Sequence, residues 1–244
     1  MYMNLKHFIV KVVIFLAKFI PNGMRFIILR GPLRGSLWIA GGAAGEAKGL
    51  SVILNLWESE QIEIAKELSS KNKICFDIGA YVGLYTLLFA RYSKIVYAFE
   101  PFTRNISFLY KTLVLNSIEN AVIIPSAVAD INGIYMFKEG IYTATGKLDK
   151  KGKHPILCVS LDYFIEKTKI FPDIIKIDVE GAEVLVFKGA KKIFLKHKPI
   201  ILLSTHGEKI KTDCLNFLKK MNYQDFIPLN GSSIENANEF LIKP

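Results

Sequence analysis

Residues 74–91, ICFDIGAYVGLYTLLFAR, determine the fold class predicted for this chain. A short apolar run ends at Asp77, and Gly79 and Gly83 precede a helical pattern that continues to Tyr92. Glycine lets the backbone turn tightly and approach a ligand closely, and the helix that follows offers free backbone N–H groups. The glycine spacing is G-x-x-x-G, so the G-x-G-x-x-G fingerprint of dinucleotide-binding proteins is not met.

Apolar runs and helical patterns alternate through the rest of the sequence. Strands are predicted at 74–76, 95–99, 121–124, 174–177 and 200–203, with two more near 224–229 and 239–243. Helices are predicted at 83–92, 103–116, 182–197 and 208–221. Because the central strands are apolar throughout, we expect a parallel sheet that is buried on both faces, as in α/β proteins. Glycines separate short β-prone runs over residues 132–160, and this pattern predicts a β-hairpin insertion.

Composition excludes several classes of protein. Of the 244 residues 51% are hydrophobic and 22% are charged, which excludes general disorder. The apolar runs are too short for a multi-span membrane protein. The three cysteines, Cys75, Cys158 and Cys214, form no C-x-x-C pair, so a disulfide scaffold and a zinc finger are not indicated, and a reducing, cytoplasmic compartment fits best.

The positive charge is concentrated at the N-terminus. The net charge is +10, and residues 1–45 hold six Lys and Arg residues but no Asp or Glu. This distribution argues against a nucleic-acid partner. Residues 5–20 predict an amphipathic helix that either contacts the inner face of a membrane peripherally or packs on the domain. We therefore divide the chain into an N-terminal helix (1–23), a lead-in of short strands and one helix at 58–70 (24–72), and an α/β domain (73–244).

Polar side chains follow the ends of four predicted strands, namely Asp77, Glu100, Asp178 and His206. Since the carboxyl ends of parallel strands share one edge of a sheet, we expect these residues to lie together at a ligand site. A carboxylate at the position of Glu100 can accept hydrogen bonds from both hydroxyls of a ribose. The pair Asp77 and Glu100 therefore favours an adenosine-containing cofactor.

Five segments resemble the FkbM family of S-adenosylmethionine-dependent methyltransferases. They are DIGAYVGLYTLLFAR (77–91), VYAFEP (96–101), PSAVAD (125–130), IIKIDVEGAEVLVFKGA (174–190) and PIILLSTHG (199–207). The IKIDVEGAE block is the specific part, and the resemblance spans residues 35–207. It implies a Rossmann-like fold with a seven-stranded, mostly parallel sheet and helices on both faces. It also implies S-adenosylmethionine as cofactor and O-methylation of a sugar, a glycan or glycolipid, or another small-molecule acceptor, and it makes 73–244 the methyltransferase domain.

The resemblance also assigns residues to the cofactor. Those expected around its methionine and sulfonium part are Asp77, Gly79, Ala80, Tyr81, Gly83 and Asp178. Those expected near the ribose are Glu100, Pro101 and Asn105, and those near the adenine are Ser126, Ala127 and Val128. Two positions depart from the family pattern: Tyr81 replaces a small or amide residue, and Thr205 stands where an acid is expected before the histidine.

An alcohol acceptor needs a group that takes up its proton. His206 is the leading candidate because an imidazole titrates near neutrality, although a helix-capping or packed histidine fits the sequence equally well. Asp178 and Glu180 are alternatives for this role, and Glu180 also fits as the acidic partner of a helix N-terminus, as does Glu183. Asp178, Glu180 and His206 could instead bind Mg²⁺ or another divalent metal, but this is the less favoured interpretation and we assign no metal from the sequence.

Two other functions remain alternatives at this point. A nicotinamide-dependent oxidoreductase would share the sheet, but the third glycine of its fingerprint is missing. A non-catalytic protein of the membrane surface would account for the basic N-terminus. The sequence identifies neither the acceptor nor the oligomeric state.

Overall fold

The computed structural model describes residues 19–42, 49–56, 58–139, 146–148, 152, 154–231 and 233–244. The helix predicted over 5–20 lies outside this part of the chain except for Phe19 and Ile20, which lie in a turn. Its membrane contact therefore stays a prediction. None of the helices in the described ranges is long and apolar enough to cross a membrane.

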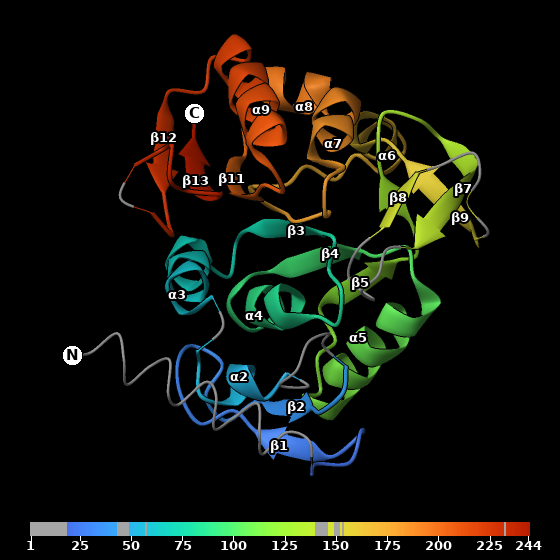
Figure 1. Cartoon of the computed structure of the whole chain (residues 1–244), viewed down its shortest axis with the longest axis vertical. Helices are drawn as coiled ribbons and strands as arrows, with labels where there is room; N and C mark the ends of the chain where they lie inside the picture. The colour runs from blue at the N-terminus through green and yellow to red at the C-terminus, as the bar shows by residue number, and fades with distance from the viewer. Residues whose placement is uncertain are drawn as a thin grey trace.

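A seven-stranded sheet forms the centre of the molecule (Figure 1). Its strands lie in the order β12 (Asp225–Pro228), β13 (Glu239–Lys243), β11 (Ile200–Ser204), β10 (Ile174–Ile177), β3 (Ile74–Ile78), β4 (Ile95–Phe99) and β5 (Ala121–Ile124). All neighbours pair in parallel except β13, which runs antiparallel to both β11 and β12. The predicted α/β fold with a seven-stranded, mostly parallel sheet is confirmed.

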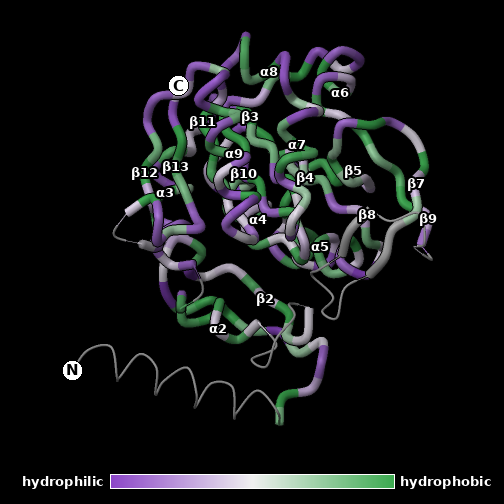
Figure 2. Tube along the Cα trace, turned by 45° about the horizontal axis from the view of Figure 1, so that its top comes forward, coloured by the Kyte–Doolittle hydropathy of each residue, from purple (hydrophilic) through white to green (hydrophobic). Residues whose placement is uncertain are grey.

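Helices cover both faces of this sheet (Figure 1). One face carries α3 (Ser59–Leu68), α4 (Leu84–Tyr92) and α5 (Thr103–Leu115), and the other carries α6 (Leu161–Thr168), α7 (Glu183–Gly189), α8 (Lys191–Lys196) and α9 (Glu208–Lys220). Side chains alternate between the two faces along each strand, so the neighbours Cys75 and Phe76 belong to different hydrophobic clusters. Figure 2 shows the central strands as largely hydrophobic, as expected for a sheet that is covered on both sides.

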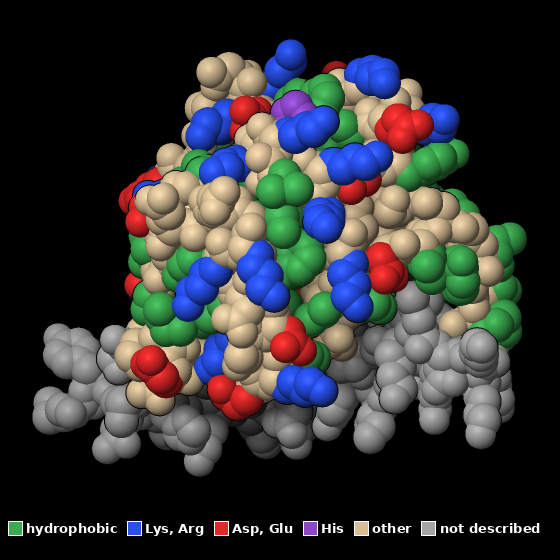
Figure 3. Space-filling view, turned by 90° about the horizontal axis from the view of Figure 1, so that it is seen from above, with side chains coloured by type: hydrophobic (Ala, Val, Ile, Leu, Met, Phe, Trp, Pro, Cys, Tyr) green, Lys and Arg blue, Asp and Glu red, His purple; other side chains and the backbone are tan. Residues whose placement is uncertain are grey.

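The helices of the second face turn their polar sides outward. Phe194 of α8 and Leu218 of α9 are fully buried, whereas Lys191, Lys196 and Lys219 are exposed. Such a division into an apolar and a charged side is typical of helices that pack on a sheet. Figure 3 shows that basic and acidic side chains are interspersed on this face.

The strand order reverses beside β3. From β3 the chain adds β4 and β5 on one side and then crosses back to place β10 and β11 on the other. The carboxyl ends of β3 and β10 therefore meet, and the Asp178 N–H donates a hydrogen bond to the Ile78 carbonyl at 3.0 Å. Ligands of open α/β sheets bind at such a switch point.

The single helix predicted over 182–197 is wrong, because the structure breaks it at Ala190 into α7 and α8. A Cβ on Gly189 would lie 2.1 Å from the Ala129 carbonyl oxygen, so only glycine permits this close approach. The Asp162 carboxylate accepts hydrogen bonds from the backbone N–H groups of Lys192 and Ile193 at 3.0 to 3.2 Å. This acceptor satisfies N–H groups at the start of a second helix, as a capping side chain does.

The predicted β-hairpin insertion is larger than expected. The structure contains a four-stranded sheet in the order β6 (Ala127–Val128), β9 (His154–Val159), β7 (Gly133–Glu139) and β8 (Gly146–Leu148). β7 and β9 form an antiparallel pair, but β9 also pairs in parallel with β6, the segment directly after the main sheet. The hairpin is therefore joined to the edge of the domain by backbone hydrogen bonds.

The lead-in packs on the α4 side of the sheet. It contains β1 (Arg25–Ile27), the antiparallel β2 (Leu37–Ile39) and α2 (Leu50–Ile53). Trp38 is buried in the same hydrophobic cluster as the core residues of α4. The Tyr92 hydroxyl donates a hydrogen bond to the Pro32 carbonyl at 2.6 Å, which fixes the lead-in against the end of α4. The amphipathic helix predicted at 58–70 is observed as α3.

Candidate functional site

The loop between β3 and α4 is built from left-handed backbone conformations. Gly79, Tyr81 and Gly83 have φ angles of 83°, 51° and 96°. The N–H groups of Gly79 and Ala80 both donate to the Phe99 carbonyl at 3.0 Å. A Cβ on Gly79 would lie 1.9 Å from the carbonyl oxygen of Asp178, so the loop lies directly against the end of β10. The glycine at 79 is therefore required both by its φ angle and by the space available.

Glu100 follows β4 and holds this loop through its carboxylate. Its Oε2 accepts the Tyr81 N–H at 2.9 Å, and its Oε1 accepts the Phe102 N–H at 3.0 Å and the Asn105 Nδ2 at 3.1 Å. Glu100 and Asn105 are both buried. Burial raises the pKa of Glu100 to about 7, and these three hydrogen bonds only partly oppose the rise.

Asp77 lies near the end of β3, just before the glycine loop, and is 2% exposed. Its Oδ2 accepts a hydrogen bond of 2.5 Å from the Thr86 hydroxyl of α4. Burial raises the pKa of Asp77 to about 6, although the Thr86 hydrogen bond and the charge of Lys176 lower it. Asp77 lies in β3, and Glu100 and Asp178 directly follow β4 and β10, the two strands that pair in parallel with β3, so the three acids lie at the same edge of the sheet.

The segment expected near the adenine follows β5. Ser126 is fully buried, and its Oγ has no hydrogen-bond partner in the described part of the chain. Ala127 is half-buried. The Val128 side chain belongs to the main hydrophobic core, so only its backbone is left for a ligand. The unpartnered hydroxyl of Ser126 fits a ligand that offers hydrogen-bonding groups, as a nucleoside base does.

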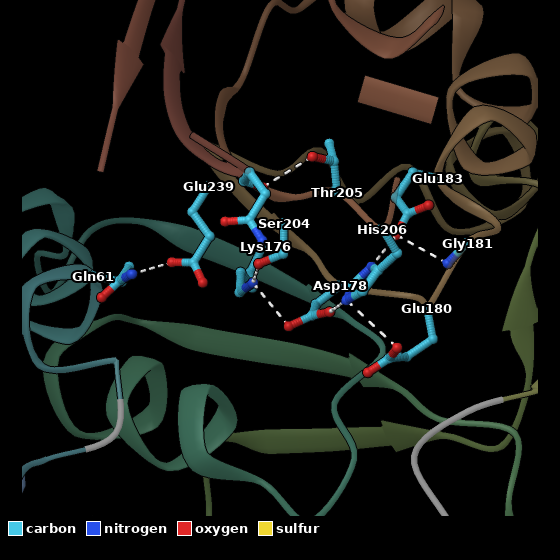
Figure 4. Close-up of polar contacts among 11 residues, drawn as sticks. Gln61, Lys176, Asp178, Glu180, Gly181, Glu183, Ser204, Thr205, His206 and Glu239 are labelled. Atoms are coloured by element: carbon cyan, nitrogen blue, oxygen red, sulfur yellow. Dashed lines mark hydrogen bonds and ion pairs between the residues drawn. The ribbon is translucent and has the colours of Figure 1, made fainter. Parts of the chain in front are cut away.

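Charged side chains meet at the ends of β10 and β11 (Figure 4). Lys176, 3% exposed inside β10, places its Nζ 3.2 Å from Asp178 Oδ2 and 2.6 Å from the Ser204 hydroxyl. The ammonium group also lies 4.9 Å from the centre of the Tyr85 ring. A buried ammonium needs such partners, so Lys176 fixes the position of the Asp178 carboxylate.

His206 follows β11 and lies among three acids (Figure 4). Its Nδ1 is 2.7 Å from Glu183 Oε1, and its Nε2 is 3.4 Å from Glu180 Oε2 and 3.7 Å from Asp178 Oδ1. The hydrogen bond to Glu183 is the largest of the effects that raise the pKa of His206 to about 9, and Asp178 and Glu180 add to it against the effect of burial. Without another ligand, His206 therefore carries a proton at neutral pH, which disfavours the predicted role of general base.

The structure brings the three catalytic candidates together. One ligand atom from each of Asp178, Glu180 and His206 lies within 4.8 Å of the others, an arrangement that could hold a metal ion. Burial also raises the pKa of Glu180. Glu180 has a left-handed φ of 52°, and the Gly181 that follows has a φ of 102°, so this loop turns sharply before α7 begins.

The sequence did not show the contact of Glu183 with His206, whereas Lys176 was open to pairing with an acid, as it does with Asp178. Glu183 does accept the Gly181 N–H at 3.1 Å at the start of α7, as a helix-capping residue would, but the same oxygen contacts His206. The place of Lys176 inside an otherwise apolar strand was the signal, because a buried ammonium group needs a polar or charged partner. Glu183 carried no such signal, because its partner His206 lies 23 residues away, in the loop after β11.

Comparison with known proteins places these residues in a family. A family model described as the methyltransferase FkbM domain matches residues 77–228. Methyltransferase FkbM from Methylobacillus flagellatus KT aligns with a TM-score of 0.53 and 16% identity over 79% of this chain and 54% of that chain. A Streptococcus mutans protein described as a SAM-dependent methyltransferase aligns with a TM-score of 0.53 and 14% identity over 92% of this chain and 56% of that chain. Among curated proteins none matches.

The structural likenesses show the fold, and this chain spans little more than half of the length of both proteins. The family match covers most of the chain, including the glycine loop, Glu100 and the segment from Asp178 to His206. It confirms the resemblance seen in the sequence and favours a methyltransferase over the nicotinamide-dependent alternative. The chain belongs to the FkbM family of methyltransferases, whose cofactor is S-adenosylmethionine.

Proposed function

We propose that this methyltransferase methylates a hydroxyl group of a sugar, a glycan or glycolipid, or another small acceptor. The proposal rests on the cluster of Asp178, Glu180 and His206 beside the glycine loop. S-adenosylmethionine supplies a methyl group whose bond to sulfur breaks as the new O–C bond forms, and the hydroxyl must give up its proton. A hydroxyl is a weak acid, so this reaction needs proton-accepting side chains next to the methyl group.

The glycine loop and the ends of β4 and β5 form the cofactor side. The Tyr81, Phe102 and Asn105 donors use three of the roughly four acceptor positions of the Glu100 carboxylate. Glu100 therefore has room for one ribose hydroxyl, on Oε2, instead of the two that the sequence led us to expect. Asn105 contributes by positioning the Glu100 carboxylate. The Ser126 hydroxyl takes up a hydrogen bond from the adenine.

The ends of β10 and β11 form the acceptor side. Lys176 already neutralises one oxygen of Asp178, and His206 holds a proton in the free protein. Glu180 is left as the group that receives the proton of the acceptor, since its carboxylate is about one-third exposed and burial raises its pKa. A higher pKa makes a carboxylate a stronger base. Alignment of the acceptor hydroxyl with the methyl group of the cofactor supplies the rest of the rate acceleration.

The test is methyl transfer from methyl-labelled S-adenosylmethionine to a panel of saccharides, glycolipids and small phenols. Mass spectrometry should find an added methyl group on oxygen, with an equal amount of S-adenosylhomocysteine. Amine-bearing acceptors form the comparison set. Methylation of amines without methylation of any hydroxyl would contradict the proposal.

A further inference from the structure

The three side chains at the ends of β10 and β11 are close enough to share one ion. His206 Nε2 is 3.4 Å from Glu180 Oε2 and 3.7 Å from Asp178 Oδ1. Neighbouring ligand atoms of an octahedral cation bound at about 2.1 Å lie about 3 Å apart. Small rotations of these half-buried side chains would close the remaining gap.

Glu183 orients the imidazole for this role (Figure 4). Its Oε1 contacts His206 Nδ1 at 2.7 Å and so turns Nε2 toward the two carboxylates. A histidine that binds a metal nearly always donates its other ring N–H to a carboxylate, a carbonyl or water. In that state His206 is a neutral ligand whose Nδ1–H donates a hydrogen bond to Glu183 Oε1.

A second observation concerns the burial of Glu183. Its side chain is fully buried, and its Oε2 has no hydrogen-bond partner within the described ranges. A buried carboxylate is costly unless positive charge lies close to it. Lys176 pairs with Asp178 Oδ2, which leaves the single imidazole of His206 to face the carboxylates of Glu180 and Glu183. A divalent cation would balance the negative charge of the Glu180 and Glu183 carboxylates better than the single imidazole does.

We propose that Asp178, Glu180 and His206 bind a divalent cation, with Glu183 as a positioning residue. Two carboxylates and one imidazole suit Mn²⁺ or Mg²⁺. Three protein ligands leave about three positions of an octahedral ion for acceptor oxygens and water, so the acceptor class is a compound with two neighbouring hydroxyls.

The catalytic part of this inference rests on the proposed O-methylation, whereas the binding of the ion does not. A hydroxyl on the cation loses its proton more easily, and the proton passes to the Glu180 oxygen that does not bind the ion. The deprotonated acceptor oxygen then forms a bond to the methyl carbon, and the sulfur keeps the electron pair of the broken S–C bond.

The test is titration of the full chain with Mn²⁺ at pH 8, followed by electron paramagnetic resonance of the free ion and by calorimetry, without cofactor or acceptor. We expect one ion per chain. Glu180→Gln and His206→Ala should weaken binding at least about tenfold, and Glu183→Gln about 10- to 100-fold. Glu166→Gln is the matched control, because its side chain is 56% exposed and pairs with Lys167 on α6; it should bind as the wild type does.

Circular dichroism and thermal unfolding should show that each variant is folded, and Glu180→Gln is the least disruptive of them because the Glu180 side chain is about one-third exposed. Absence of Mn²⁺ binding at millimolar concentration, or equal binding by Glu180→Gln and the wild type, would overturn the site. Hydroxyl methylation that persists fully in EDTA would overturn the catalytic part and leave the proposed function intact. Mn²⁺ binding without methylation of any hydroxyl would support the site and count against the proposed function instead.

Discussion

At the ends of β3 and β4 the structure places glycines, backbone N–H groups and two buried carboxylates, whereas at the ends of β10 and β11 it places a cluster of charged side chains. The Glu100 carboxylate has three donors from the protein, and the glycine loop is fixed by its own backbone. The Asp178, Glu180 and His206 cluster instead gathers acids around one imidazole. The cofactor side is thus sensitive to space and backbone conformation, and the acceptor side to charge.

The largest effect is expected where space is tightest. Gly79→Ala should lower the free energy of unfolding by about 3 kcal/mol or more, because it adds a clash with the Asp178 carbonyl to the strain of a positive φ. Gly35→Ala is the matched control, since Gly35 has a φ of 85° but nothing within 4 Å of an added Cβ. It should cost about 1 kcal/mol. Urea unfolding of the two variants checks this, and equal losses would show that the close approach to Asp178 is unimportant.

A change of charge on the acceptor side should slow methyl transfer and leave the affinity for the cofactor nearly unchanged. Glu180→Gln removes the proposed proton acceptor and should lower kcat about 100-fold, with the Kd for S-adenosylmethionine within about threefold of the wild type. Steady-state kinetics and calorimetry measure the two quantities. A loss of cofactor affinity as large as the loss of kcat would show that the two sides do not act separately.

The cofactor side should respond to pH through Glu100. With a pKa of about 7, Glu100 gains negative charge as the pH rises from 6 to 8, and the carboxylate accepts the ribose hydroxyl and attracts the cationic cofactor. The affinity for S-adenosylmethionine should therefore increase about tenfold over this range. Glu100→Gln should bind weakly at every pH, and a wild-type slope retained in this variant would assign the effect to another group.

The smallest effect is expected at Ser126. Ser126→Ala removes a buried hydroxyl that has no partner in the described structure, so the free energy of unfolding without cofactor should stay the same or rise by up to about 1 kcal/mol. The affinity for S-adenosylmethionine should fall about fivefold, the equivalent of one neutral hydrogen bond. Thermal unfolding and calorimetry test both values, and unchanged affinity would remove Ser126 from the cofactor side.

The sheet and its switch point could be predicted because their causes are local or periodic. Strands that are apolar throughout must be covered on both faces, and the polar residues that end them share one edge when the strands run in parallel. Asp77, Glu100 and Asp178 therefore lie at the ends of three neighbouring parallel strands, as expected. The break at Ala190 was not predictable, since the groups that pack and cap there, the Ala129 carbonyl and the Asp162 carboxylate, belong to distant segments.

The sequence by itself determined the alternation of strands and helices, the glycine turn and the acids at the strand ends, since these follow from residue type and period. Only the tertiary structure decided what each acid does. It supplied the Glu100 carboxylate with hydrogen-bond donors from the protein itself and buried Glu183 against His206. It also placed Lys176 between Asp178 and Ser204. The strand order brings these partners together, and the hydrogen bonds and charges that then reach a side chain set its pKa and its free acceptor positions.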